Sequence, residues 1–116
     1  MKSVLEFDEV LLHHRTVDFR KSINGLTEIV QNELELDPFG RYLFVFLCKD
    51  KKKIKFLYWD ETGFALWYKR LEKDRFPWPK EGEKIISITA EQLSWLLSGI
   101  DLWKIQPHKK LNFEQV

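Results

Sequence analysis

The stretch 53–79 carries basic and aromatic side chains of the kind that bind nucleic acid. Its sequence, KIKFLYWDETGFALWYKRLEKDRFPWP, interleaves cations with flat rings. Cations neutralise phosphates and release counterions, while rings stack on unpaired bases or line a groove. The candidate DNA contacts are Arg20, Lys21, Lys69, Arg70, Lys73 and Arg75, and the candidate aromatic contacts are Trp67, Tyr68 and Trp78.

Two other interpretations fit the same residues. The rings could fill the protein's own core, with the cations solvating its rim. Alternatively, the surface could dock on a protein, because Trp, Tyr and Arg are enriched at the energetic centres of interfaces. Residue types alone leave all three interpretations open.

Positive charge is concentrated in the middle of the chain. The net formal charge is +1, but residues 49–80 hold ten Lys and Arg against five Asp and Glu, a difference of +5. Residues 1–48 and 81–116 have differences of −3 and −1. This distribution predicts a local basic patch rather than a general polycation.

Catalytic chemistry has weaker candidates. A metal-dependent nuclease needs carboxylates that converge on metal ions. Asp60 ends a predicted strand, but Asp37 and Asp101 follow predicted helices and are typical of turns. We therefore expect no catalytic residue, no cofactor and no bound metal. The carboxylates that a nuclease would use are Asp18, Asp37, Asp60 and Asp101.

His13, His14 and Cys48 do not form a recognisable metal or nucleophile motif. Adjacent histidines on a strand point to opposite faces and cannot grip one ion together. Cys48 ends the apolar run LFVFLC, so we expect a buried structural thiol.

Length and composition predict a single domain over residues 1–116, and the predicted strands and helices make it an α+β fold: a small, mainly antiparallel sheet with two principal helices. The hydrophobic content of 44% and charged content of 32% are typical of a globular protein. No apolar run is long enough to span a bilayer, and the start lacks a signal-peptide core, so we expect a cytoplasmic location without membrane contact.

Three strands form the framework for the basic-aromatic stretch. The segments 43–48, 53–59 and 64–71 are rich in residues that favour strands and predict an antiparallel meander. Glu61-Thr62-Gly63 predicts a hairpin turn, with Gly63 able to adopt the left-handed conformation. Neither face of the hairpin is purely polar, so we expect one face to meet the core and the other a partner.

Two helices and two shorter strands complete the prediction. Apolar spacing indicates a helix over 21–36, with Asp18 as N-cap and a turn at 37–40. This places Arg20 and Lys21 in the first helical turn, where the helix dipole disfavours cations. The misfit is a small hint of a role in binding, but two solvated side chains are the favoured explanation.

The ends of the chain give less regular patterns. Residues 4–12 predict a strand that could continue to Phe19, and 85–88 predict a short edge strand. Thr89 and Gln92 form a capping-box pattern for a second helix over 91–98. Residues 102–116 are expected to form an irregular tail.

Several segments together resemble a known family. DFRKSINGL, LDPFGRYLFVF, the 53–79 stretch and TAEQLSWLLSGID occur in the order and spacing of the small Orf2 proteins, also called TnpB, of IS66-type insertion sequences. The resemblance extends from about residue 18 to residue 101. These proteins are distinct from the RNA-guided nucleases that share the TnpB name.

The resemblance implies an accessory protein needed for efficient transposition and encoded beside a larger transposase. Its expected partners are the transposase of the same element and the DNA ends of that element. It supplies no catalytic residues, so the candidate site depends on the basic-aromatic pattern. The alternatives remain a protein-interaction subunit without DNA contact and, less favoured, a metal-dependent nuclease.

Overall fold

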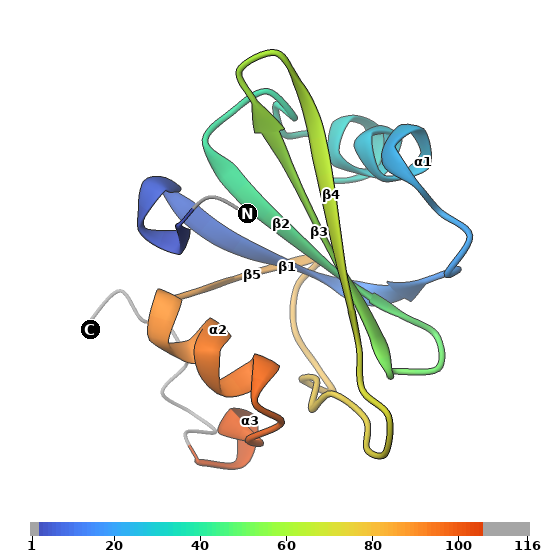
Figure 1. The fold of residues 1–116 in the computed structure, drawn as a ribbon, viewed down its shortest axis with the longest axis vertical. Coiled ribbons are helices and arrows are strands. Elements are labelled where there is room, and N and C mark those ends of the chain that lie inside the picture. Colours follow the sequence, from blue (N-terminus) through green and yellow to red (C-terminus); the bar gives the residue numbers. More distant parts are fainter. Residues whose placement is uncertain (1–2, 106–116) are drawn as a thin grey trace.

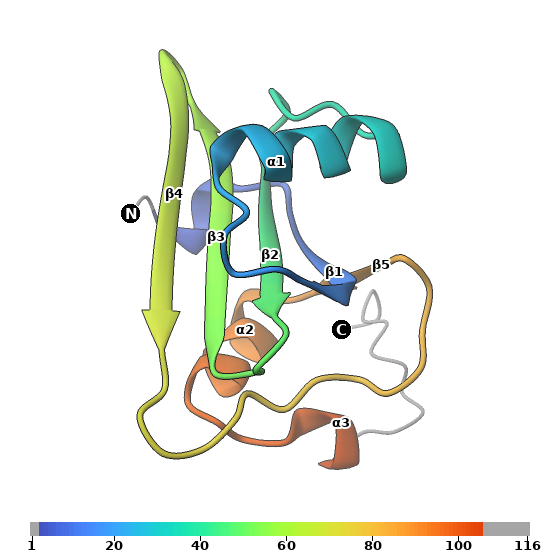
Figure 2. The same cartoon turned by 90° about the vertical axis from the view of Figure 1, so that its right-hand side faces the viewer.

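The computed structural model describes residues 3–105 and has an α+β fold, with helices on both faces of one five-stranded sheet (Figures 1 and 2). The sheet is mostly antiparallel, and from one edge to the other its order is β4-β3-β2-β1-β5. The predicted fold class is confirmed. The strands are β1 (Glu9–Val17), β2 (Tyr42–Cys48), β3 (Lys53–Asp60), β4 (Gly63–Arg70) and β5 (Ile85–Ile88).

The predicted meander is confirmed as β2, β3 and β4, and β5 is an edge strand as expected. β1 occupies a position that periodicity did not indicate. It pairs in parallel with β2 and antiparallel with β5. Because parallel neighbours need a crossover connection, the chain between β1 and β2 leaves the sheet and forms a helix over one face.

The N-terminal strand begins later than predicted. Val4–Glu6 forms a single 3-10 turn, and the Ser3 side chain accepts a hydrogen bond from the N–H of Leu5 at 3.2 Å. The strand starts at Glu9. A serine that can cap the first turn thus outweighs the local preference of Val4 and Leu5 for a strand.

The first predicted helix is shorter and less regular than expected. In place of one helix over 21–36, the chain forms α1 (Ile23–Glu28) followed by a π-helical turn over Ile29–Glu33. The predicted apolar side is confirmed, because Leu26 and Val30 are fully buried against the sheet. The N–H of Leu34 donates to the carbonyl of Ile29 at 2.9 Å, which closes the wider π-helical turn.

The predicted N-cap of this helix is wrong. Ser22 occupies the N-cap position, while the Asp18 carboxylate accepts hydrogen bonds from the N–H and the guanidinium of Arg20. The N–H of Lys21 donates to the carbonyl of Asp18 at 3.0 Å, so segment 18–22 is a separate turn before the helix rather than its first turn. Arg20 and Lys21 consequently lie before the helix, so the dipole argument does not apply to them.

Both faces of the sheet are buried against the protein's own core. On the α1 face, Phe44, Phe46 and Leu57 pack with the helix, while Val45 and Phe56 pack on the opposite side. Our expectation that only one face of the hairpin meets the core is therefore wrong. Apolar residues on both faces of β2 and β3 require a covering layer on each side.

The second helix covers the other face. α2 (Ala90–Leu97) begins with the predicted capping box: the Thr89 hydroxyl accepts from the N–H of Gln92 at 3.0 Å, and the Gln92 side chain accepts from the N–H of Thr89 at 2.9 Å. Ser98 caps the C-terminus. Gly99 follows with a φ of 85°, a left-handed conformation that favours glycine.

Part of the expected irregular tail is helical. α3 (Leu102–Ile105) places Leu102 in the core, and the indole N–H of Trp103 donates to the carbonyl of Pro77 at 3.1 Å. Residues 106–116 of the predicted tail lie outside the described residues. Within residues 3–105, no helix has the length and apolarity to cross a membrane.

The turn between β3 and β4 is a hairpin, but its special conformation is not at the glycine. Asp60 pairs with Gly63, so Glu61 and Thr62 form the loop. Glu61 has a φ of 55°, whereas Gly63 is outside the left-handed region. The predicted role of Gly63 is therefore wrong, and Glu61 adopts the less common conformation.

Candidate nucleic-acid interface

Three basic segments meet at one end of the sheet. The N–H of Lys49 donates to the carbonyl of Val17 at 3.1 Å, which joins the end of β1 to the turn between β2 and β3. The N–H groups of Leu71 and Phe76 donate to the carbonyls of the same turn, at 2.8 and 2.7 Å. Segments 18–22, 49–53 and 69–75, which are distant in sequence, thus lie together. Figure 1 shows β3 beginning and β4 ending at this end.

We call this region the basic end. Its three segments hold ten Lys and Arg against four Asp and Glu, an excess of six positive charges. All six candidate DNA contacts belong to it, together with four lysines of the turn that were not singled out. Its cationic residues are Arg20, Lys21, Lys49, Lys51, Lys52, Lys53, Lys69, Arg70, Lys73 and Arg75.

The candidate residues at the end of β4 lie on two faces, not one. Tyr68 pairs with Lys55, and Arg70 pairs with Lys53, on the α1 face of the sheet. Trp67 pairs with Phe56, on the α2 face, and Lys69 shares that side by alternation. Trp67 is 48% exposed and Tyr68 52% exposed, because β4 is an edge strand.

Phe19 is an exposed ring at the basic end that the candidate set missed. It is 59% exposed, and the Lys53 ammonium lies 5.6 Å from its ring centroid. Lys55 donates to the carbonyls of Phe19 and Lys21 and thereby fixes the segment against β3. The only signal in the sequence was an aromatic residue between charged neighbours in DFRK.

Ion pairs hold part of this charge in place. The Arg20 guanidinium donates to both carboxylate oxygens of Asp18, at 3.1 and 2.9 Å. These hydrogen bonds, with that of the Arg20 N–H, hold the pKa of Asp18 well below its ordinary value. Arg70 donates to Glu72 at 3.0 Å, which raises the pKa of Arg70. Asp18 and Arg70 therefore both stay ionised at neutral pH.

Lys53 connects the turn to the α1 face. Its ammonium pairs with the Asp50 carboxylate, and this hydrogen bond, together with the charge of Asp50, raises the pKa of Lys53. A surface hollow of about 500 Å³ lies beside this pair, lined by residues that follow β1 and by residues from the end of β2 to the start of β3. Its lining residues are Asp18, Phe19, Arg20, Cys48, Lys49, Asp50 and Lys53.

Trp78 is built into the fold rather than presented to a partner. Its indole N–H donates to the carbonyl of His14 at 2.9 Å, and its ring packs against the core on the α2 face. Phe76, in the same extended segment, is only 2% exposed. Lys73 and Arg75 lie just before this anchor and are exposed.

The candidate nuclease carboxylates occupy separate places. Asp18 pairs with Arg20 at the basic end, whereas Asp60 ends β3 at the opposite end. Asp37 accepts from the N–H of Phe39 at 2.9 Å, as a turn residue does. Asp101 similarly accepts from a nearby N–H, and residues 3–105 contain no group of three or more potential metal ligands.

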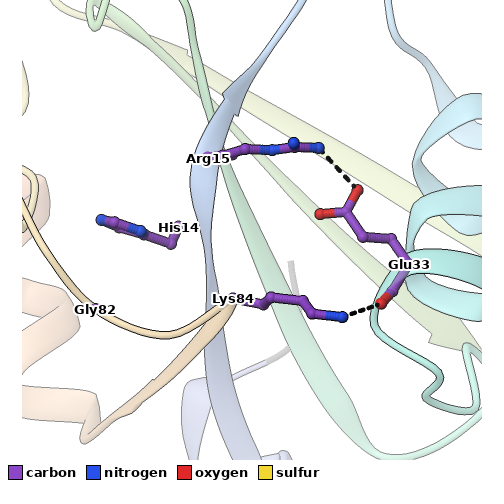
Figure 3. A pocket seen from close by; sticks show the side chains of 5 residues that line it. All are labelled: His14, Arg15, Glu33, Gly82 and Lys84. Atoms are coloured by element: carbon purple, nitrogen blue, oxygen red, sulfur yellow. Dashed lines mark hydrogen bonds and ion pairs between the residues drawn. The ribbon is translucent and has the colours of Figure 1, made fainter.

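The two histidines point to opposite sides, as alternation predicted. His13 is buried and hydrogen bonds to Glu33 at 2.9 Å, while His14 hydrogen bonds to the carbonyl of Pro79 at 2.9 Å. A pocket of about 430 Å³ opens beside them, where Arg15 pairs with the Glu33 carboxylate and Lys84 donates to the Glu33 carbonyl (Figure 3). Glu33 thus provides an acceptor for both Arg15 and Lys84 in this pocket.

Cys48 is fully buried, in agreement with its predicted structural role. Burial raises the pKa of its thiol. A protonated, enclosed thiol is a poor nucleophile.

Comparison with known proteins adds a family match. The family model described as IS66 Orf2 like protein matches residues 8–107. The chain is 31% identical over 97 residues to "Uncharacterized protein y4jC" of Sinorhizobium fredii (strain NBRC 101917 / NGR234), covering 84% of this chain and 83% of that protein. It is 40% identical over 87 residues to "Uncharacterized protein y4hO" of the same organism, covering 75% of each. No solved structure gives a significant match.

Proposed function

The chain belongs to the IS66 Orf2-like protein family, and we propose that it is a non-catalytic accessory factor in DNA transposition that contacts the ends of the element through its basic end. The observation that carries this proposal is the convergence of three basic segments at one end of the sheet. Their excess of six positive charges lies on a chain whose net charge is only +1. Such a concentrated field attracts a polyanion.

Exposure of the cations supports the same function. Four cations are exposed at the end of β4 and in the loop that follows it: Lys69, Arg70, Lys73 and Arg75. Phosphate contacts of this kind position a protein on DNA and give strongly salt-dependent affinity. They do not by themselves select a base sequence.

A binding titration tests this function. Purified protein is mixed with labelled duplex carrying the end of the element, and with a scrambled duplex, at low and at moderate salt. The proposal predicts binding that weakens as salt rises, and preference for the end sequence would show recognition. A folded Lys69→Glu/Arg70→Glu variant should lose affinity for both duplexes. Unchanged affinity in that variant would contradict the proposal.

Contact with the transposase is a second candidate function, and the geometry of β4 favours it. β4 is an edge strand, so its outer backbone groups face no other strand of the described sheet. Trp67, 48% exposed on the α2 face, lies beside this edge. An edge strand with an adjacent aromatic side chain suits addition of a partner's strand.

A pull-down with the transposase distinguishes docking at the β4 edge from DNA binding, because the two should respond differently to salt. Association through the edge and Trp67 should persist at high salt and weaken in Trp67→Ala. Trp95→Ala, which alters a partly buried tryptophan on α2, serves as a matched control. Equal capture of wild type and Trp67→Ala would count against this docking surface.

A further inference from the structure

We propose that the α1 face of the basic end binds single-stranded DNA, with unpaired bases stacking on Phe19 and Tyr68. This inference deepens the proposed function and rests on DNA contact at the basic end. It names a class of ligand that charge alone does not select. The inference is based on the exposed rings of Phe19 and Tyr68, which lie beside cations held by ion pairs.

The two rings belong to distant segments but share the same lysine neighbours. Phe19 lies 5.6 Å from the Lys53 ammonium, measured to the ring centroid. Tyr68 pairs across the strands with Lys55, whose ammonium donates to the carbonyl of Phe19. The fold thus holds both aromatic side chains on one face, near one edge of the sheet.

Exposure distinguishes these rings from most other aromatic side chains of the described chain. Phe19 is 59% exposed and Tyr68 is 52% exposed. By contrast, the indole N–H groups of Trp78 and Trp103 are hydrogen bonded, and both rings pack on the core. A large ring left half exposed beside cations offers a surface for another flat group.

The charges around the rings fit a nucleic-acid backbone. Lys53 and Arg70 are cross-strand partners on the α1 face, and Arg20 follows Phe19 directly. Each is held by a neighbouring carboxylate, so the cations occupy defined positions. Phosphates could contact these cations while bases reach the rings, as on other single-strand platforms.

The proposed ligand is single-stranded because stacking on these rings requires bases whose faces are free. In a duplex the base faces are stacked on one another, so a ring on a sheet surface cannot reach them without unstacking. Unpaired bases expose these faces, and stacking on an aromatic side chain tolerates any base sequence. A protein of this geometry should therefore prefer unpaired DNA to duplex DNA with the same number of phosphates.

Fluorescence anisotropy with two labelled probes tests the preference. The probes are oligo(dT) and a hairpin duplex with an equal number of phosphates, each at the same low salt. Wild type should bind oligo(dT) at least about fivefold more tightly than the duplex, the gain expected from about one stacked base. Equal affinity for the two probes would overturn the inference and leave the proposed function standing. Absence of binding to both would overturn the two together.

Ring-deletion variants test the residues. Phe19→Ala and Tyr68→Ala should each weaken oligo(dT) binding by about tenfold and duplex binding by less than about twofold. Tyr68→Phe retains the ring and should bind like wild type. Phe39→Ala is a matched control, because Phe39 is 52% exposed and packs with Trp59 and Phe64 at the opposite end of the sheet. Unchanged oligo(dT) affinity in both folded ring deletions would overturn the assignment.

Discussion

Lys55 in β3 donates hydrogen bonds from its ammonium to the main-chain carbonyl of Phe19, in the connection that follows β1. The same ammonium donates to the carbonyl of Lys21. Lys55 is nearly buried, so its charge is used within the fold rather than offered to a partner. This contact attaches one basic segment to the sheet and positions Phe19, Arg20 and Lys21 beside the others.

Replacing this ammonium should loosen the basic end. Lys55→Met keeps the apolar stem but removes the donor, so the free energy of unfolding should fall by about 1–2 kcal/mol. Urea unfolding followed by tryptophan fluorescence measures the change. Lys49→Met, which alters an exposed lysine of the adjacent turn, should change stability by less than about 0.5 kcal/mol. Equal stability of wild type and Lys55→Met would show that the contact contributes nothing to the fold.

The capping box of α2 should contribute measurably to stability. Thr89→Ala removes the acceptor of the Gln92 N–H and should lower the free energy of unfolding by about 1 kcal/mol. Ser94→Ala provides the control, because Ser94 is exposed within the same helix and alanine favours helices. Thermal unfolding of the two variants beside wild type checks the prediction, and a Thr89→Ala variant as stable as Ser94→Ala would refute it.

Glu33 should make stability sensitive to acid. Burial opposes its ionisation, but the hydrogen bond from His13 and the charges of His13, Arg15 and Lys84 outweigh this effect, so the pKa of Glu33 lies below its ordinary 4.5. Below about pH 4.5 the unfolded chain therefore binds a proton at Glu33 that the folded chain resists. The stabilisation is complete above that pH and is lost as the pH falls through the folded pKa.

Comparison with Glu33→Gln isolates this effect. The difference in unfolding free energy between wild type and the variant should be largest above about pH 4.5 and should shrink in acid. Urea titrations at a series of pH values measure it. A difference that stays constant, or grows in acid, would contradict the assigned role of Glu33.

Local patterns predicted the elements that depend on local chemistry. The apolar run that forms β2 and the Thr89–Gln92 capping box appear in the structure where the sequence placed them. The start of the first helix was harder to predict, because Asp18 fits the N-cap pattern but pairs with Arg20 instead. Cap preference alone does not decide between a helix start and an ion pair within a turn that precedes the helix.

Pairing and layering required information that local patterns lack. Alternation assigns faces to a strand but not neighbours, so the parallel pairing of β1 with β2 was missed. The expectation of a free hairpin face also failed, although the unbroken apolar run of β2 already required cover on both sides. Its neighbour β3 shares those two layers.

The candidate site was predicted in part. The cations near β4 follow from composition, but the convergence of segment 18–22 with them depends on Lys55, a contact 36 residues away from Phe19. Phe19 was therefore missed, while Trp78 was included because a sequence does not show that its indole N–H bonds to His14.

The salt dependence of DNA binding in two matched arginine variants tests the central claim most directly. Arg70 pairs with Glu72 at the basic end, and Arg41 pairs with Asp8 at the opposite end; both arginines are exposed. Arg70→Gln and Arg41→Gln change net charge equally and each removes one exposed ion pair. Affinity for the end duplex is measured over a range of salt concentrations. We predict that Arg70→Gln binds more weakly and lowers the slope of log K against log salt by about one, while Arg41→Gln matches wild type. Equal slopes and affinities for the two variants would contradict a DNA contact at the basic end.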